Sequence, residues 1–215
     1  QLGNESLLDD YHRDWLYSET PVFVPIPSGS NISDIALGNQ HSCAALVNGS
    51  VYCWGDNSYS QLGTEGVVYS AGSNSYSRSY SPILLSSPGQ TDVIEIEAGG
   101  VHTCTIVSNG SVYCWGRNDH GQLGTPRTSQ YSWVIDHQAT PALVSFPAHR
   151  TATSLSMGVM HSCALLDDDS VWCWGENNDG QLGIGVSPGA YSDTDSWMRD
   201  EPHVVSGFQG SLPTF

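Results

Sequence analysis

The chain contains no lysine. Its six basic residues are all arginine, against 22 acidic residues, and the formal net charge is −16 over 215 residues. A protein that binds nucleic acid needs a basic surface to neutralise phosphates, and this composition offers none. The same negative field disfavours anionic membranes. We therefore expect no nucleic-acid partner, and an acidic surface that favours solubility.

Long apolar segments are also missing. No run approaches the roughly 18–20 residues that span a bilayer, so we expect no membrane insertion. The sequence shows no signal peptide and begins with Gln1 rather than methionine. We interpret it as the mature form of an exported protein. A fragment of a larger protein is the alternative.

Charge of either sign is scarce, at 13% of the residues, whereas glycine, serine, tyrosine and tryptophan are abundant. Such a composition is typical of short strands joined by many turns. It favours an all-β protein.

Three short motifs each occur three times, at intervals of 61 and then 59 residues. A proline opens each unit, at Pro21, Pro82 and Pro141, and an apolar run follows it. The motif copies are His41-Ser42-Cys43, His102-Thr103-Cys104 and His161-Ser162-Cys163; Cys53-Trp54-Gly55, Cys114-Trp115-Gly116 and Cys173-Trp174-Gly175; and Gln61-Leu62-Gly63, Gln122-Leu123-Gly124 and Gln181-Leu182-Gly183. Self-similarity at a fixed period indicates a repeat architecture.

This order of motifs resembles the regulator of chromosome condensation repeat family, over roughly residues 21–205. The resemblance implies one four-stranded β-propeller blade per repeat. We therefore expect an all-β fold of three four-stranded propeller-type blades, an incomplete or open propeller with N- and C-terminal arms. The best-known family member is a nuclear exchange factor for a small GTPase. This chain differs in repeat number, cysteines and acidity, so we do not carry that activity over.

The expected units are an N-terminal arm at 1–20, blade repeats at 21–81, 82–140 and 141–201, and a C-terminal tail at 202–215 that begins a partial fourth repeat. Within the second repeat, four short apolar runs at strand-and-turn spacing predict the four strands of one blade. They are Ile83–Leu85, Val93–Ile96, Thr103–Val107 and Val112–Trp115.

The six cysteines form three pairs with nine residues between the partners. If Cys43 faces Cys53 across a hairpin, a three-residue loop ends at Gly49, which suits its left-handed last position. The same count applies to the other repeats, and opposed residues of antiparallel strands are close enough to bridge. We predict Cys43–Cys53, Cys104–Cys114 and Cys163–Cys173. Zinc and free thiols are the alternatives, although the short Cys-x2–4-Cys spacing of closed zinc sites is absent.

His41, His102 and His161 are candidate acid–base residues. Each occupies the same place in its repeat, whereas catalysis needs one unique constellation, so we interpret them as structural. The sequence also has no Gly-x-Ser-x-Gly nucleophile elbow. We predict no catalytic residues and no enzyme.

Acidic clusters offer oxygen ligands for calcium at Asp167–Asp169 and at Asp193, Asp195, Asp200 and Glu201. Neither has the EF-hand spacing, so we interpret them as solvated loops and expect no cofactor, with calcium as the alternative. Four sequons make Asn4, Asn31, Asn48 and Asn109 candidates for N-glycosylation.

Three blades do not close a ring, because closed propellers typically have about four to eight. Two exposed blade faces therefore need cover from the chain ends. Leu8, Tyr11 and Trp15 fall on one helical face before the first repeat, and Pro202–Val205 restarts an opening strand. The assembly candidates are Leu8, Tyr11, Trp15, Val204, Val205 and Phe215.

These features predict a non-enzymatic extracellular structural subunit that self-associates head to tail into a fibre or ring, with chain ends completing the neighbouring subunit. Three disulfides point to an extracellular location, secreted or at the cell surface. The alternative is a secreted binding module that recognises a protein or glycan through the aromatic and serine-rich loops at 64–81, 125–140 and 184–201.

Overall fold

The computed structural model describes residues 2–3, 18–27, 31–65, 69–71, 74–85, 92–128, 135–147, 150–185 and 198–206. Twelve of the strands in these residues form three antiparallel four-stranded sheets, and β4 (Tyr69–Ala71) and β5 (Asn74–Tyr76) form a separate hairpin. The expected all-β fold of three blades is confirmed. Within the described residues, no helix has the length and apolar character needed to cross a membrane.

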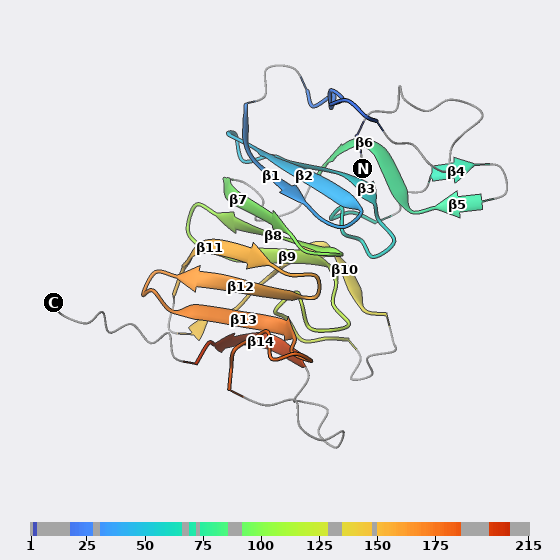
Figure 1. Cartoon of the computed structure of the whole chain (residues 1–215). Coiled ribbons are helices and arrows are strands. Elements are labelled where there is room, and N and C mark those ends of the chain that lie inside the picture. Colours follow the sequence, from blue (N-terminus) through green and yellow to red (C-terminus); the bar gives the residue numbers. More distant parts are fainter. Residues whose placement is uncertain are drawn as a thin grey trace.

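Each blade has three consecutive strands and a fourth strand that follows after a long connection (Figure 1). Blade 1 contains β1 (Ile32–Leu37), β2 (His41–Leu46), β3 (Val51–Asp56) and β6 (Arg78–Leu84). Blade 2 contains β7 (Val93–Ala98), β8 (His102–Val107), β9 (Val112–Arg117) and β10 (His137–Leu143). Blade 3 contains β11 (Ala152–Met157), β12 (His161–Leu166), β13 (Val171–Glu176) and β14 (Met198–Val204).

The blades do not coincide with the expected repeat units. The run at Ile83–Leu85 was expected to open blade 2, but Ile83 and Leu84 end the strand that closes blade 1, where Ile83 lies opposite Cys53. Self-similarity sets the period of a repeat but not its phase, and only the pairing partner of the proline-containing strand decides where a blade ends. The proline lies where the ladder register shifts, on an outermost strand, where a missing N–H is tolerated.

The expectation of an unpaired strand at Pro202–Val205 is wrong for the same reason. Residues 198–204 pair with β13 and complete blade 3, with His203 opposite Cys173. The segment with the corresponding sequence before blade 1, residues 21–27, belongs to none of the three sheets.

The central hairpin of each blade has the register that the cysteine spacing predicted. Cys43 lies opposite Cys53, and the corresponding cysteines are opposed in the other two blades. The disulfides are Cys43–Cys53, Cys104–Cys114 and Cys163–Cys173, and no described cysteine is free. The hairpin loops end in a left-handed residue, Gly49 at φ 81° and, less suited to it, Asp169 at φ 63°.

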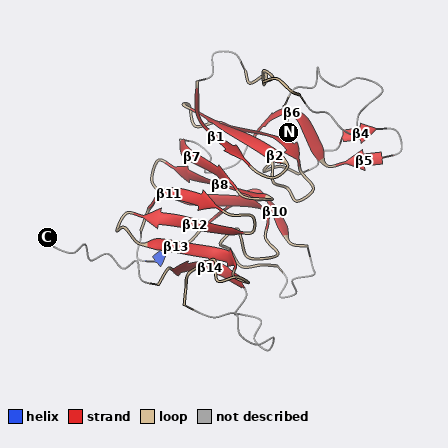
Figure 2. Cartoon of the chain, in the orientation of Figure 1, coloured by secondary structure: helices blue, strands red, loops and turns tan. Residues whose placement is uncertain are grey.

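The apolar core lies between the blades. One cluster packs Cys43, Ala45 and Leu62 of blade 1 against Ile96 and Trp115 of blade 2. A second cluster joins blades 2 and 3 in the same way. The closest contacts between blades involve their first two strands, and Figure 2 shows the three sheets following one another in a fan. Each blade therefore depends on its neighbour for burial of its inner face.

Candidate interaction surfaces at the blade joints and end faces

A chain of four polar groups connects blade 1 with blade 2. Thr103 Oγ1 donates to the main-chain oxygen of Gln61 at 3.1 Å, and Trp115 Nε1 donates to the same oxygen at 3.0 Å. Because its proton goes to that carbonyl, the Thr103 hydroxyl accepts from His41 Nε2 at 2.9 Å. The joint thus needs a histidine that carries a proton on Nε2.

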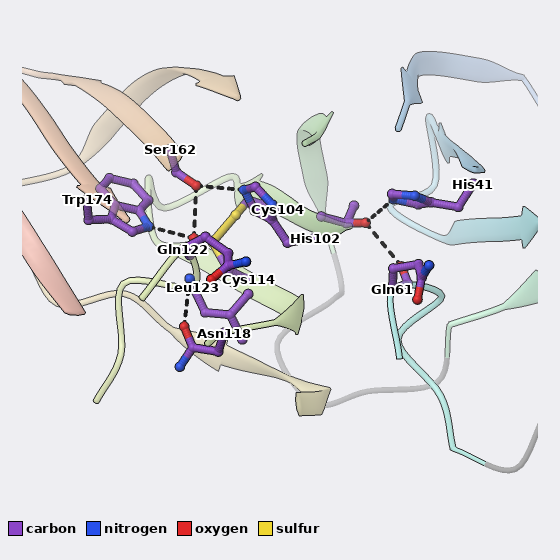
Figure 3. The surroundings of a disulfide bond; sticks show 11 residues. His41, Gln61, His102, Cys104, Cys114, Asn118, Gln122, Leu123, Ser162 and Trp174 are labelled. Carbon is purple, nitrogen blue, oxygen red and sulfur yellow. Dashed lines mark hydrogen bonds between the residues drawn. A yellow bond between two sulfur atoms is a disulfide. The ribbon is translucent and has the colours of Figure 1, made fainter. Parts of the chain in front are cut away.

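Blades 2 and 3 repeat this chain (Figure 3). His102 Nε2 donates to Ser162 Oγ at 2.9 Å, and that hydroxyl donates to the main-chain oxygen of Gln122 at 2.9 Å. Trp174 Nε1 donates to the same oxygen at 3.0 Å. The two joints share this geometry, which explains why histidine, a hydroxyl residue, glutamine and tryptophan recur together in the sequence.

Burial keeps these histidines neutral. It lowers the pKa of His41 to about 4 and, together with the positive charge that His41 and His161 would carry, that of His102 to about 3. The Nδ1 atoms of both rings are buried with no hydrogen-bond partner in the described structure. The histidines brace one blade against the next, so the structural interpretation from sequence agrees with their contacts.

Carboxylates on the first strands add a second connection at each joint. Asp34 Oδ2 accepts from the Ile96 amide at 2.9 Å, and Glu95 Oε1 accepts from the Leu155 amide at 2.7 Å. These acidic residues satisfy main-chain donors of the following blade. Sequence reasoning missed this role, although both residues directly precede the apolar residue of the first strand at the same repeat position.

Side chains near the fourth strands connect the blades at the rim. The Arg117 guanidinium lies 4.7 Å from the centre of the Tyr59 ring, and Ser60 Oγ lies 3.1 Å from His137 Nδ1. Arg127 Nε donates to Asp200 at 2.7 Å. Arginine, a scarce residue here, therefore connects blade 2 to blade 1 through the Tyr59 ring and to blade 3 through Asp200.

The first strand of blade 1 exposes apolar residues whose counterparts in the other two blades are buried. Ile35 is 61% exposed, whereas its counterparts Ile96 and Leu155 are 0% and 5% exposed under the preceding blade. Ile32 is likewise exposed where Val93 is buried. We call this side of the blade the blade 1 end face; it includes the exposed Ile32 and Ile35 and the buried Ser42 and Trp54.

Blade 3 exposes the opposite half of the joint. Leu165 is 39% exposed, whereas its counterparts Ala45 and Ile106 are fully buried. At the first joint the Thr103 hydroxyl accepts a hydrogen bond from His41. Among the described residues, no hydroxyl accepts the corresponding hydrogen bond from His161. We call the surface formed by His161, Leu165, Val205 and the turn at 181–183 the blade 3 end face.

A family model of the regulator of chromosome condensation (RCC1) repeat matches residues 48–106, 109–165 and 168–213. A second model of the same repeat matches residues 32–61, 93–122 and 152–181. The chain belongs to the RCC1 repeat family.

Known RCC1-type proteins share the repeat over a part of their length. Ultraviolet-B receptor UVR8 of Arabidopsis thaliana is 29% identical over 167 residues, which are 78% of this chain and 34% of that protein. E3 ubiquitin-protein ligase HERC2 of Homo sapiens is 30% identical over 154 residues, 71% of this chain and 3% of that protein. The ligase name thus belongs to a protein that is almost entirely outside the match.

Solved structures of RCC1-type propellers show the same fold. Yeast RCC1 (Prp20), solved with Kap60 bound to it, superposes with a TM-score of 0.69 at 23% identity, over 87% of this chain and 40% of that one. Human WBSCR16 superposes with a TM-score of 0.63 at 22% identity, over 83% and 40%. The chain therefore spans less than half of each of these neighbours.

Several residues predicted from sequence have places in this RCC1-type structure. Asn48 and Asn109 are exposed at hairpin tips, where each side-chain oxygen accepts from the amide two residues on, and Asn31 is exposed before β1. Their glycosylation stays a prediction. Asn4, Leu8, Tyr11, Trp15 and Phe215 lie outside the described residues, as do Asp193, Asp195 and much of the three variable loops.

Of the described acidic residues considered for calcium, three lie next to an arginine. Asp167 and Asp168 lie 3.7 and 3.1 Å from Arg150, and Asp200 is bound by Arg127. Within the described ranges, no group of three or more histidine, cysteine or acidic side chains is arranged to hold a metal ion.

Of the two described assembly candidates, Val205 belongs to the blade 3 end face, whereas Val204 corresponds to Leu84 and Leu143, which are exposed in complete joints.

One motif copy was missed in the sequence. Gln1-Leu2-Gly3 is a fourth Gln-Leu-Gly, and Gly3 contacts Trp54 on the blade 1 end face. The repeated tripeptide itself was the signal that would have revealed it.

Proposed function

We propose that the chain is a non-enzymatic structural subunit that self-associates head to tail, blade 3 of one copy docking on blade 1 of the next. The observation that carries this proposal is the matched exposure of Ile35 and Leu165, whose counterparts are buried at both internal joints. The link is thus the blade end faces rather than the unpaired strand that the sequence suggested.

The two end faces are halves of one interface that the chain already builds twice. Blade 3 offers the histidine and apolar side chain, and blade 1 contains Ser42, the counterpart of Thr103, which is buried in the single chain and would have to be uncovered on docking. An interface between two different surfaces propagates into a ring or a filament. Contiguous apolar patches on a protein surface also mark interaction sites.

The internal joints support a non-enzymatic role. His41 and His102 donate to neighbouring hydroxyls and are kept neutral by burial. The three disulfides support an extracellular location, because such bonds persist in oxidising environments.

A second candidate function is recognition of a different protein. It is favoured by yeast RCC1, a propeller of the same fold that was solved with Kap60 bound to it. On this alternative the purified chain is a stable monomer, and the rim and loops form the binding surface.

Charge substitutions on each end face separate these functions. Ile35→Asp and Leu165→Asp each place a carboxylate in a position that the joint would bury, and we expect each variant to be monomeric in sedimentation velocity while the unmodified chain assembles. An equimolar mixture of the two variants should give dimers and nothing larger, because one unmodified pair of end faces remains.

Val47→Asp is the matched control. Val47 is an exposed apolar residue at a hairpin tip, and its counterparts Ser108 and Asp167 are exposed in the other blades, so this variant should assemble normally. A monomeric unmodified chain at all concentrations, or assembly of both end-face variants, would overturn the proposal.

A further inference from the structure

The blade 1 end face carries a slot over the indole of Trp54, and the chain's own Leu2–Gly3 lies in it. Gly3 is buried with φ at 67°, and a Cβ added to it would lie 2.7 Å from Trp54 Nε1 and 2.9 Å from Cδ1. Only a residue without a side chain approaches an indole this closely in this backbone conformation.

The same contact occurs once in each internal joint. Gly63, with φ at 74°, lies over Trp115, and a Cβ there would be 3.1 Å from Nε1. Gly124, with φ at 69°, lies over Trp174, with a corresponding distance of 3.0 Å. In both joints the glycine ends a Gln-Leu-Gly turn of the preceding blade, so the slot receives this tripeptide from its neighbour.

Blade 3 presents a turn of the same kind at its end face. Gly183 ends Gln181-Leu182-Gly183 with φ at 61°, and a Cβ there would lie 2.9 Å from Val205. Gly124 has the equivalent neighbour, Val144, at 3.0 Å. The turn on blade 3 is therefore shaped as its two internal counterparts are, and its described surroundings contain no tryptophan.

We propose that Leu2–Gly3 and the 181–183 turn of a second copy compete for the Trp54 slot, so that the segment at residues 2–3 regulates head-to-tail assembly. This inference rests on the proposed function. Two glycines do not fit over one indole at such distances, so docking of a second copy displaces Leu2–Gly3. The apparent association constant for the second copy is then the intrinsic constant multiplied by the fraction of chains in which the slot is open.

Gly3→Val tests the competition in the full chain, because the added side chain collides with the Trp54 ring. The Trp54 indole N–H, identified with a Trp54→Phe variant, should then lose hydrogen-exchange protection in NMR spectra of dilute protein. The association constant from sedimentation should rise, by about tenfold if Leu2–Gly3 fills the slot in about nine of ten molecules. At concentrations where Gly3→Val assembles, the indole N–H should be protected again.

Gly49→Val controls for backbone strain, since Gly49 also has a left-handed φ of 81° but lies at a hairpin tip. It should leave Trp54 protection and association unchanged. Retained protection in Gly3→Val would refute occupation of the slot. Lost protection without tighter association, in a chain that otherwise assembles, would refute the competition alone. Absence of assembly in every variant would refute the proposed function and the competition with it.

Discussion

The protonation of a histidine at a joint depends on how deeply the neighbouring blade buries it. His102 is fully buried between blades 2 and 3, and its Nε2 donates a hydrogen bond to Ser162. Charging it would place a cation in an apolar interface, which explains why burial lowers its pKa to about 3. His41 is in the same position one joint earlier, with a pKa of about 4.

The free energy of unfolding should therefore fall in mild acid. The unfolded chain binds protons at these histidines below about pH 6.5, whereas folded His41 and His102 stay neutral until about pH 4 and 3. Their contribution is complete above pH 6.5 and is lost as the pH falls toward those values. At pH 5 the loss is about 2 kcal/mol per histidine.

Urea unfolding of His102→Gln at pH 7.5 and 5.0 isolates one of these contributions. Glutamine keeps an N–H donor for Ser162 but does not titrate, so the difference in unfolding free energy between the two pH values should shrink by about 2 kcal/mol. A variant with the same pH dependence as the unmodified chain would show that His102 titrates normally in the folded state.

At the scale of strands and hairpins, the three disulfides have similar geometry but differ in solvent exposure. The Cys43–Cys53 and Cys104–Cys114 bonds are fully buried under the following blade. Cys163 in blade 3 is partly exposed, because its side of the hairpin belongs to the blade 3 end face. The chemistry is identical and only the neighbouring blade differs.

Limited reduction of the folded chain should open Cys163–Cys173 first. A reductant reaches a sulfur only where the protein leaves access. Alkylation after brief treatment, followed by peptide mapping, should label Cys163 and Cys173 well before the other four cysteines. In urea the three bonds should react at similar rates, and equal rates in the folded chain would contradict the difference in cover.

The whole molecule carries a net charge of −16 and two apolar end faces. Two copies that approach head to tail repel each other through this charge over the Debye length, about 30 Å at 0.01 M salt and about 3 Å at 1 M. The centre of each joint is built from apolar contacts and from hydrogen bonds between neutral groups, which salt screens little.

Self-association should therefore strengthen with salt. Sedimentation velocity at 0.02 and 0.5 M sodium chloride should give a larger association constant at the higher concentration. Leu165→Asp should remain monomeric in both solutions, which separates the blade joint from general salting out. Weaker association at high salt would indicate that opposite charges, rather than these end faces, hold the copies together.

Local sequence patterns were sufficient to predict the central hairpin of each blade. Nine residues between Cys43 and Cys53, with Gly49 at the loop end, determined strand, turn and disulfide together, because all the interacting groups lie within about a dozen residues. The repetition of this unit also determined the number of blades. The partner of Pro82–Leu84 was not predictable in this way, since the strands before and after it offer similar edges.

The sequence by itself therefore determined the repeat, its hairpin register, its disulfides and the acidity of the chain. Only the tertiary structure decided which sheet takes each fourth strand, which hydroxyl receives each histidine proton, and which isoleucine is left in solvent. Ile35 and Ile96 are indistinguishable in their local sequence patterns, but a preceding blade covers only Ile96. Burial is a property of the neighbour across the joint, and that neighbour lies some sixty residues away along the chain.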